Sequence, residues 1–580
     1  MLRNAAPEAL AALEEEATWF SLPAGWQLFG AGEPADGVSF LVSGSLAAFR
    51  PLERGEHQLA GYIRPGEPVG EMAQIAHELH TNSVFAIRDS EMLKLSPAAF
   101  ERLLRAHPAL WERMARLMLS RARAQGRTSA RAEPKVYALI ATSPTIDLTL
   151  RARALQNALK RIGKSACIIG QEGAEMESAW FDALEHDHDA VLLISPVADT
   201  HWFRTCLRQA DRIWVLARAD ARPSTPLLPQ EDASPARQFK LVDVVLLHHG
   251  SDRQAATTEE WRMACDAARL FHWNGLEDDD AARLARMIAG RSIGVVLSGG
   301  GARAYAHLGV IRALRETGLP IDVCGGTSMG AIVAACVAMG WNDEETELRI
   351  RKAFVESNPL GDYVLPVVAL TRGRRVEDRL QEHFGEALIE DLKIPFFCVS
   401  TNLATGTVRV HRTGLLRKAL RATISLPGIL PPVIDDGLLV DGAVLRNFPV
   451  DVLKDIHRGP IIGVDVAREI SIDPEEFRNP PDFAGWVARH GMRSPPPIAT
   501  LLMRTATLGI NPWEGRAGAD LLIAPEMPDV DLRDWKKFDS AVAAGYESAV
   551  AALQRQHSLF SAPPAEARAL PASGALEAAE

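Results

Sequence analysis

Two glycine-rich turns between residues 293 and 330 hold the groups of this chain that are best suited to chemistry. The second turn, Gly326–Gly330, reads Gly-Thr-Ser-Met-Gly. In a G-x-S-x-G pattern the small residues allow a sharp strand-to-helix turn, which exposes the serine hydroxyl as a nucleophile. The first turn, Gly299–Gly301, is a triple glycine whose N–H groups can face a developing oxyanion with no side chain in the way. A nucleophile and an anion hole in succession predict acyl transfer.

Each turn is expected to follow a strand and to open a helix. The expected strands are Gly294–Leu297 and Ile321–Val323, and the second helix is expected at Ala331–Met339. A glycine-rich turn before a helix is also typical of dinucleotide-phosphate sites. That fingerprint needs a glycine at its sixth position, but this position is Ala304 here. It also needs an acidic residue after the next strand, but there the chain continues into the serine turn. The motifs therefore favour acyl transfer.

A general base is harder to find from the sequence. Four histidines come into question, and none lies in a motif typical of a base: His307, His383, His411 and His457. The first of them is expected to pack behind the triple glycine. Asp441 ends a short apolar strand and precedes Gly442 and Ala443. Its carboxylate can accept the serine proton if burial raises its pKa. Asp-Gly is also the ordinary signature of a β-turn, and spacing alone favours this interpretation as a turn.

Together, the three motifs resemble those of the patatin-like phospholipases, over residues 291–455. That family is marked by Gly-Gly-Gly-x-Arg, Gly-x-Ser-x-Gly and Asp-Gly-Gly or Asp-Gly-Ala in this order. The chain has these motifs and the family's flanking sequences at Gly299–Arg303, Gly326–Gly330, Ser425–Pro427, Pro431–Val433, Asp441–Ala443 and Asn447–Val450. Ala304 stands where the family usually has glycine, and the better helix former should be tolerated there.

The resemblance implies a Ser–Asp dyad without histidine. Ser328 would form the acyl-enzyme, Asp441 would take and return the proton, and water would release the fatty acid. The oxyanion hole would lie in the loop Gly299–Ala302, with the N–H groups of Gly300, Gly301 and Ala302 as donors. Arg303 is expected to hold this loop, with contact to a lipid phosphate as the alternative. Gly326, Gly330, Gly442 and Ala443 would support the motifs, and no metal or cofactor is expected.

The composition of the whole chain sets limits on its class. At 580 residues the chain should hold three or four domains, and its 47% hydrophobic and 24% charged residues are ordinary for a globular protein. The net charge of −11 argues against nucleic acid as a partner. Six scattered cysteines without a C-x-x-C pair suggest neither a zinc site nor a disulfide framework. Without a signal-peptide pattern or a long apolar run, we expect a cytoplasmic protein whose membrane contact is peripheral, at the inner face.

Residues 1–130 are expected to form a β-roll, because short apolar runs alternate with Gly- and Pro-rich turns before a helix at Pro97–Arg121. The region resembles a cyclic-nucleotide-binding domain. Gly70 and Glu71 match the start of that family's phosphate cassette, but His80–Asn82 stand where its arginine belongs. Without the guanidinium a cyclic phosphate loses its main charge-assisted partner, so we expect poor binding of cyclic nucleotides.

Residues 134–285 alternate strands and helices, which predicts an α/β domain with a parallel sheet. The expected strands and helices are Val136–Ala141, Leu148–Ile162, Met176–Glu185, Ala190–Ser195, Arg212–Ala217 and Leu241–His248. No G-x-x-x-x-G-K-[ST] motif is present, which argues against a nucleoside triphosphatase. The run Cys206–Asp211 and the order of the domains resemble the neuropathy target esterase family, over about residues 20–530, and imply a lysophospholipase.

The remaining expectations concern the C-terminal half. The patatin-like domain with its extension should cover residues 290–555, and the Ala- and Pro-rich tail, 556–580, is expected to be disordered. The cations of Thr371–Arg379 fit either an anionic membrane surface or a solvated loop and helix start. Residues 477–512 fit either a lid or a packed helix. Alternatives to the lysophospholipase are a broader phospholipase A or triacylglycerol lipase, and a non-catalytic lipid-binding regulatory protein. The oligomeric state is not predicted.

Overall fold

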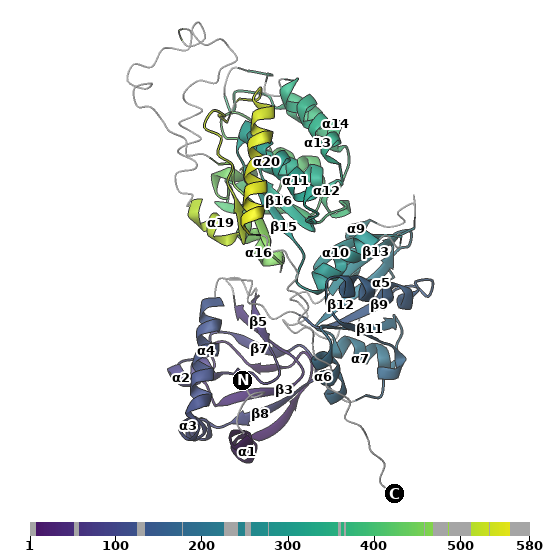
Figure 1. Cartoon of the computed structure of the whole chain (residues 1–580), viewed down its shortest axis with the longest axis vertical. Helices are drawn as coiled ribbons and strands as arrows, with labels where there is room; N and C mark the ends of the chain where they lie inside the picture. The colour runs from purple at the N-terminus through teal and green to yellow at the C-terminus, as the bar shows by residue number, and fades with distance from the viewer. Residues whose placement is uncertain are drawn as a thin grey trace.

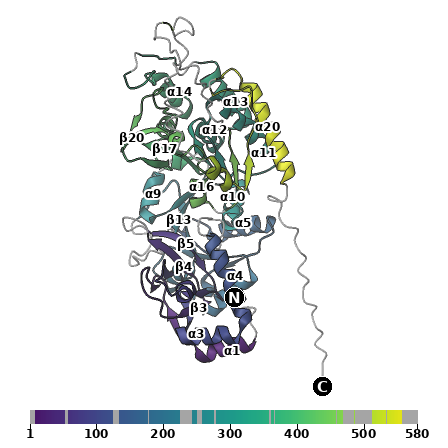
Figure 2. The same cartoon turned by 90° about the vertical axis from the view of Figure 1, so that its left-hand side faces the viewer.

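A computed structural model of the chain shows three units in succession (Figure 1). It describes residues 7–51, 57–124, 134–176, 178–224, 242–249, 257–275, 278–357, 361–364, 367–457, 459–467, 485, 512–532 and 534–556. In both views the third unit occupies one end of the long axis and the first two units the other (Figure 2). The predicted multidomain fold class, a β-roll followed by two α/β units, is confirmed. Of residues 477–512 and the tail, only 485, 512 and 556 lie within the described residues.

The first unit is built from two four-stranded antiparallel sheets, with strand orders β1-β8-β3-β6 and β2-β7-β4-β5. Its strands are β1 (Thr18–Leu22), β2 (Gln27–Phe29), β3 (Val38–Ser43), β4 (Leu46–Pro51), β5 (His57–Ile63), β6 (Pro68–Val69), β7 (Ser83–Ala86) and β8 (Ser90–Leu95), with helices α1 (Pro7–Glu16) and α2 (Glu71–Ala76). The helical stretch expected at Pro97–Arg121 is present, but it is divided into two helices. The chain forms α3 (Pro97–Ala106) and α4 (Pro108–Ala124), because Pro108 cannot donate the N–H bond that would continue a helix.

The second unit is a six-stranded parallel sheet in the order β10-β11-β9-β12-β13-β14. Its strands are β9 (Val136–Ala141), β10 (Ala166–Ile169), β11 (Ala190–Pro196), β12 (Arg212–Arg218), β13 (Val242–His248) and β14 (Arg269–Asn274), and its helices include α5 (Leu148–Arg161), α6 (Ser178–Asp187), α7 (His201–Gln209), α9 (Thr258–Cys265) and α10 (Asp278–Ile288). Both faces of the sheet carry a buried apolar cluster, which is why its strands read as continuous hydrophobic runs.

The third unit has a mixed sheet in the order β19-β20-β17-β16-β15-β21-β22, with β18 beside β17. Its strands are β15 (Gly294–Leu297), β16 (Val323–Thr327), β17 (Phe396–Asn402), β18 (Thr407–His411), β19 (Val433–Ile434), β20 (Leu438–Asp441), β21 (Ile461–Val464) and β22 (Leu521–Ile523). Its helices are α11 (Ala306–Glu316), α12 (Ser328–Ala338), α13 (Asp343–Ile350), α14 (Arg374–Phe384), α15 (Leu416–Thr423), α16 (Val450–Ile456), α19 (Pro512–Gly518) and α20 (Phe538–Arg555). Strand β16 therefore runs on through Gly325 and Gly326, and the helix after it starts at Ser328, three residues earlier than expected.

The first two units are joined by a buried ion cluster. The guanidinium of Arg88 donates to the carboxylate of Glu185 on α6 and lies 3.3 Å from that of Asp211. It also donates to the carbonyl of Gly44 at 3.1 Å. The Arg88 side chain is only 2% exposed, so its charge needs both partners. At the next junction Nε2 of His272 lies 2.8 Å from the carbonyl oxygen of Glu390.

Candidate active site

The two glycine-rich turns meet because they follow neighbouring parallel strands. The triple glycine follows β15 and Ser328 follows β16, so both lie at the carboxyl edge of the sheet, where open α/β sheets bind ligands. Ser328 has a φ of 54°, in the left-handed region that non-glycine residues seldom adopt. A Cβ atom at Gly330 would lie 2.4 Å from the carbonyl oxygen of Ser298, so the turn needs its glycine. This is the geometry of a nucleophile elbow.

Asp441 approaches Ser328 from strands on the side of β16 that is opposite to β15 and the glycine loop. Strand β20 runs antiparallel to β17 and ends with Asp441 opposite Ser400. The hydroxyl of Ser328 donates a 2.7 Å hydrogen bond to Oδ2 of Asp441, and the N–H of Ala443 donates a 2.8 Å bond to Oδ1. The Asp-Gly-Ala turn therefore orients the carboxylate, as well as reversing the chain.

The surroundings of Asp441 favour its protonated form more than water does. The residue is fully buried, and this burial raises the pKa of its carboxyl group to about 7. The hydrogen bonds from Ala443 and Ser328 lower the pKa again, but only in part. Within the described residues no cation forms an ion pair with it. A carboxylate with a pKa near neutrality is a stronger base than an ordinary aspartate, which is what abstraction of a serine proton requires.

The glycine loop differs from its prediction at Ala302, one of the three residues expected to donate an N–H group to the oxyanion. The N–H of Gly299 donates to the carbonyl of Asn447 at 3.2 Å, and the N–H of Ala302 donates to that of Leu532 at 2.9 Å. Both N–H groups are therefore already used to hold the loop, and the expectation that Ala302 is an oxyanion donor is corrected. For Gly300 and Gly301 no such acceptor is found within the described part of the chain. These two N–H groups are left as the candidate donors.

Other side chains support this loop from a distance in sequence. Arg303 is buried, and its guanidinium donates to the carbonyls of Val466, Met527 and Val530. That contact agrees with the local role expected for Arg303. Gly301 has a φ of 53°, and a Cβ there would lie 2.3 Å from the carbonyl oxygen of Leu532, so only glycine fits.

Two supporting residues were not identified as functional from the sequence. The side-chain amide of Asn447 donates to the carbonyl of Gly299, and the backbone carbonyl of Asn447 accepts the N–H of Gly299. Asn447 therefore binds both backbone groups of Gly299. The hydroxyl of Thr423 accepts a 3.0 Å bond from the N–H of Ser328 and donates to the carbonyl of Val399. Asn447 lies in a flank that matched the family, but Thr423 gave no separate signal.

None of the four histidines considered above bonds to Ser328. His307 is buried behind the glycine loop, where its Nε2 lies 2.9 Å from the carbonyl oxygen of Ser298, and burial lowers its pKa to about 4. His411 lies 2.7 Å from the hydroxyl of Ser400, and its pKa is also lowered to about 4 by burial. His457 lies beside Ser292, and His383 lies on α14. These positions leave Asp441 as the only one of the candidate bases that contacts Ser328.

The cassette of the first unit is filled by a neutral ring. His80 is buried and stacks on Phe29, with ring centroids 3.7 Å apart. Burial lowers the pKa of His80, so the ring does not replace the missing cation. Glu71, at the start of α2, is buried nearby, and Arg88 is held in the junction with the second unit. Poor binding of cyclic nucleotides therefore stays a prediction.

The second unit also has no ordinary phosphate site at the helix after its first strand. Asp147 caps α5 by accepting the N–H of Leu150 at 2.9 Å, so a carboxylate occupies the place where a P-loop would hold an anion. The sequence Gly163-Lys164-Ser165 follows a helix and precedes β10, whereas a P-loop follows a strand. In the described residues no group of three or more His, Cys, Asp or Glu side chains is placed to hold a metal ion.

Comparison with family profiles gives the same order of units. Residues 295–454 match the patatin-like phospholipases, residues 19–107 the cyclic nucleotide-binding domain, and residues 135–265 the neuropathy target esterase family P-loop like domain. The last match concerns the fold of the sheet, since the chain lacks the phosphate-binding motif.

Whole-chain comparison finds relatives that match most of this chain. An uncharacterised NTE family protein of Mycobacterium bovis is 31% identical over 559 residues, which cover 93% of this chain and 92% of that protein. A protein of Mycobacterium tuberculosis matches with the same identity and coverage. Mouse patatin-like phospholipase domain-containing protein 7 is 28% identical over 81% of this chain, which covers 39% of the mouse protein.

Proposed function

The chain belongs to the neuropathy target esterase (NTE) family, and from this premise we propose that it releases the fatty acid from lysophospholipids or related monoacyl lipids. As a patatin-like phospholipase it is a lipid ester hydrolase. The monoacyl specificity and the dyad are our proposal. The observation that carries the dyad is the 2.7 Å hydrogen bond between Ser328 and Asp441 at the carboxyl end of β16, and the monoacyl specificity follows from the family resemblance.

In the first half of the reaction, Ser328 Oγ attacks the ester carbonyl carbon while its proton passes to Asp441 Oδ2. The carbonyl oxygen becomes an oxyanion, which the N–H groups of Gly300 and Gly301 stabilise. As the tetrahedral intermediate collapses, the bond to the glycerol oxygen breaks and Asp441 returns the proton to that leaving group. The products of this half are the acyl-enzyme and the glycerophospho-alcohol.

The second half repeats these steps with water. Asp441 accepts a proton from a water molecule, whose oxygen attacks the acyl carbon of the ester on Ser328. The intermediate collapses with return of the proton to Ser328 Oγ, and the fatty acid leaves. The raised pKa of Asp441 supports its role in both directions, because a group with a pKa near 7 can take and give a proton at neutral pH.

Contact with the lipid surface is proposed to be peripheral. Within the described part of the chain, every helix is too short or too polar to cross a bilayer. Val367 and Val368 are 91% and 67% exposed in a loop that ends beside Arg372 and Arg374, two exposed cations. Apolar side chains flanked by cations suit the surface of an anionic bilayer. Replacing both valines by aspartate should reduce sedimentation of the protein with vesicles that contain phosphatidylglycerol, and unchanged sedimentation would refute this contact.

The proposed activity is tested by active-site labelling and a substrate panel. A fluorophosphonate should modify Ser328 in the parent protein, and Ser328→Ala should lose both the label and ester hydrolysis. The parent should hydrolyse lysophosphatidylcholine faster than phosphatidylcholine or trioleoylglycerol. Faster hydrolysis of either diacyl or triacyl lipid would replace the monoacyl specificity by a broader phospholipase or lipase. Absence of label and of turnover would indicate a lipid-binding protein instead.

A further inference from the structure

The backbones of both dyad residues are held by the end of one helix, α15. Its last residue, Thr423, accepts the N–H of Ser328 at 3.0 Å through its side-chain hydroxyl. Two residues later, the carbonyl of Ser425 accepts the N–H of Asp441 at 2.9 Å. A shift of this helix end would therefore move the nucleophile and the base, and their 2.7 Å hydrogen bond depends on the position of both.

The start of α15 is bound to the 3-10 turn η7 (Ile389–Asp391) and to the chain that leads into it. The carboxylate of Glu390 accepts the N–H of Gly414 at 2.7 Å, and the N–H of Leu416 donates to the carbonyl of Ala387 at 2.9 Å. Among the described residues no side chain caps α15, so the position of its start depends on these bonds. The helix has eight residues and is therefore only about 12 Å long, a short rigid connection between Glu390 and the dyad.

The second unit holds η7 from outside the catalytic unit. His272 lies on β14, and its Nε2 is 2.8 Å from the carbonyl oxygen of Glu390. Thr258, the first residue of α9, donates its hydroxyl to the carboxylate of Asp391. Both side chains of the second unit are buried at this junction. Two hydrogen bonds therefore run from the second unit to the turn that binds α15.

A second histidine fixes the direction of the bond from His272. Burial lowers the pKa of His272, so its ring is neutral at pH 7 and carries a single N–H. Nε2 of His248 lies 2.8 Å from Nδ1 of His272. Since a carbonyl oxygen can only accept, His272 carries its proton on Nε2 and accepts from His248 through Nδ1. The pair therefore presents one oriented donor to the catalytic unit.

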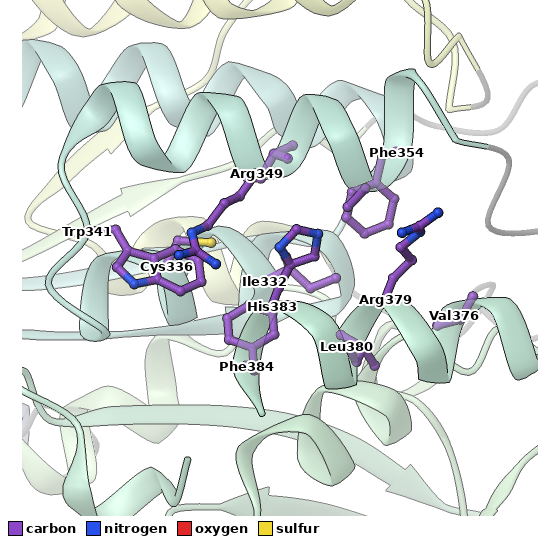
Figure 3. Close-up of a pocket in the computed structure, with 12 residues that line it drawn as sticks. Ile332, Cys336, Trp341, Arg349, Phe354, Val376, Arg379, Leu380, His383 and Phe384 are labelled. Atoms are coloured by element: carbon purple, nitrogen blue, oxygen red, sulfur yellow. The ribbon is translucent and has the colours of Figure 1, made fainter. Parts of the chain in front are cut away.

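The chain that leads into η7 begins on the nucleophile helix. Phe384, the last residue of α14, stacks on Trp341 with ring centroids 5.4 Å apart. Figure 3 shows this pair beside Cys336 of α12, the helix that begins at Ser328. One end of the connection between α14 and η7 is therefore fixed against α12, and the second unit fixes the other end.

We propose that Glu390 is a positioning residue for the dyad and that the second unit sets its position. The second unit then contributes to catalysis through the placement of other groups. The inference rests on the dyad of the proposed function, because it concerns the placement of Ser328 and Asp441. Reaction rates depend steeply on such placement, since a shift of about 1 Å in a reacting group can cost about 100-fold.

The first test replaces the Glu390 carboxylate in the full chain. Glu390→Met keeps the length of the side chain but offers only a weak acceptor to the N–H of Gly414, whereas Glu390→Gln keeps an acceptor oxygen and is the matched control. With p-nitrophenyl butyrate, Glu390→Met should lower kcat about 10- to 100-fold per mole of folded protein, with KM within about twofold. Its rate constant for labelling by a fluorophosphonate should fall by a similar factor. Glu390→Gln should stay within about threefold of the parent in both measurements.

The second test breaks one contact that comes from the second unit. Thr258→Val keeps the shape of the side chain and removes the hydroxyl that binds Asp391. Thr205→Val is the matched control, because Thr205 is also buried in the second unit but donates to the carbonyl of His201 within its own helix. Thr258→Val should lower kcat and the labelling rate constant about three- to tenfold at unchanged KM, as expected for the loss of one hydrogen bond that holds the turn. Thr205→Val should leave both within about twofold.

Two results would overturn the proposal. If folded Glu390→Met has the kcat and labelling rate of the parent, or if Glu390→Gln loses as much as Glu390→Met, the acceptor at this position does not place the dyad. If Thr258→Val and Thr205→Val have equal effects, the second unit does not act through η7. The folded fraction of each variant is taken from circular dichroism, so a loss of stability alone does not count as support.

Folding failure of Glu390→Met does not leave the proposal open. Hydrogen exchange by mass spectrometry then compares Thr258→Val with the parent and with Thr205→Val. Peptides that cover residues 414–425 should exchange faster in Thr258→Val alone, and those of β21 and β22 at the rate of the parent in all three. Unchanged exchange over 414–425 overturns the proposal. The proposed function fails separately, through retention of p-nitrophenyl butyrate hydrolysis by Ser328→Ala, whatever the variants at the junction do.

Discussion

Asp243 in the second unit and Asp441 in the third are both fully buried aspartates on strands of a central sheet. Their surroundings are opposite. Asp243 accepts hydrogen bonds from both Arg212 and Arg269, at 2.7–3.0 Å, and from the indole of Trp214. Asp441 accepts only neutral donors, from Ser328 and Ala443, within the described residues.

The difference shows what makes a buried carboxyl group a base. Burial raises the pKa of both, because it disfavours the charged form. At Asp243 the two guanidinium groups more than reverse that effect and hold its pKa well below the ordinary value, so the carboxylate is charged at neutral pH. At Asp441 the neutral donors leave the pKa at about 7. Burial without a cation yields a proton acceptor, whereas burial with two cations yields a structural ion pair.

The same substitution at both aspartates tests whether only Asp441 acts as a base. Asp441→Asn should lower kcat/KM by about 1,000-fold or more, because loss of a positioned base removes a large factor and leaves the serine proton without an acceptor. Asp243→Asn should leave the activity of each folded molecule unchanged. The measurement is kcat/KM per mole of folded protein, with the folded fraction taken from circular dichroism. Activity of Asp441→Asn within tenfold of the parent would refute the dyad.

A second variant tests whether the backbone N–H groups of the glycine loop stabilise the oxyanion in the transition state. Gly300→Val brings a side chain against Val466 and should lower kcat by about 100- to 1,000-fold, with much less change in KM, because the oxyanion exists only after the attack. Gly61→Val is the control, since a Cβ there meets no atom within 4 Å. A rise in KM alone would make the loop a substrate-binding element.

Stability should respond in the reverse order. Asp243→Asn should destabilise the second unit by about 3–5 kcal/mol, because it removes the buried carboxylate that Arg212 and Arg269 share. Asp441→Asn should leave the unfolding midpoint unchanged or raised at neutral pH. Urea denaturation followed by tryptophan fluorescence measures both. Equal losses for the two variants would mean that Asp441 also has a cationic partner.

The free energy of unfolding should depend on pH in opposite directions through the two carboxyl groups. Because Asp441 must be ionised to act as a base, kcat/KM should rise about tenfold per pH unit below pH 7 and level off above it. Its raised pKa stabilises the folded state below the ordinary value near 4, and that contribution is lost as pH rises to about 7. Asp243 has a lowered pKa, so its contribution is present above pH 4 and is lost only on acidification. Asp441→Asn should remove the loss of stability between pH 4 and 7, and an unchanged profile would contradict the assignment.

The smallest expected effect is that of cyclic nucleotides on the first unit. Arg88 is already paired with Glu185 and Asp211 in the junction, and burial lowers the pKa of His80. We expect neither cyclic AMP nor cyclic GMP to release heat on titration into the full chain, or to change its esterase rate. Micromolar binding of either would show that the cassette finds a cation elsewhere.

Sequence reasoning reached the parts of this molecule that depend on short motifs. The elbow, the glycine loop and the Asp-Gly turn are local patterns, and the order of the three units follows from strand and helix periodicity. The catalytic roles of Ser328 and Asp441 stay a prediction until they are measured. The helix break at Pro108 was visible in the sequence, since proline interrupts the backbone bonds of a helix, and it should have been predicted.

What sequence reasoning missed depends on partners that are distant along the chain. Ala302 was expected to donate to the oxyanion, but its N–H is taken by Leu532, 230 residues later. Likewise the junction of Arg88 with Glu185 arises from packing that no local pattern encodes. Backbone N–H groups carry no residue type, so their partners cannot be read from a sequence.

The left-handed backbone at Ser328 sets natural selection for activity against selection for stability. A serine at this φ costs the folded state about 1–3 kcal/mol, which glycine would not incur. A lineage released from the need to hydrolyse lipids would therefore gain stability by losing its nucleophile. Homologues with glycine at this position should have a higher free energy of unfolding. Their presence in a genome would mark copies that have lost catalysis and kept the fold.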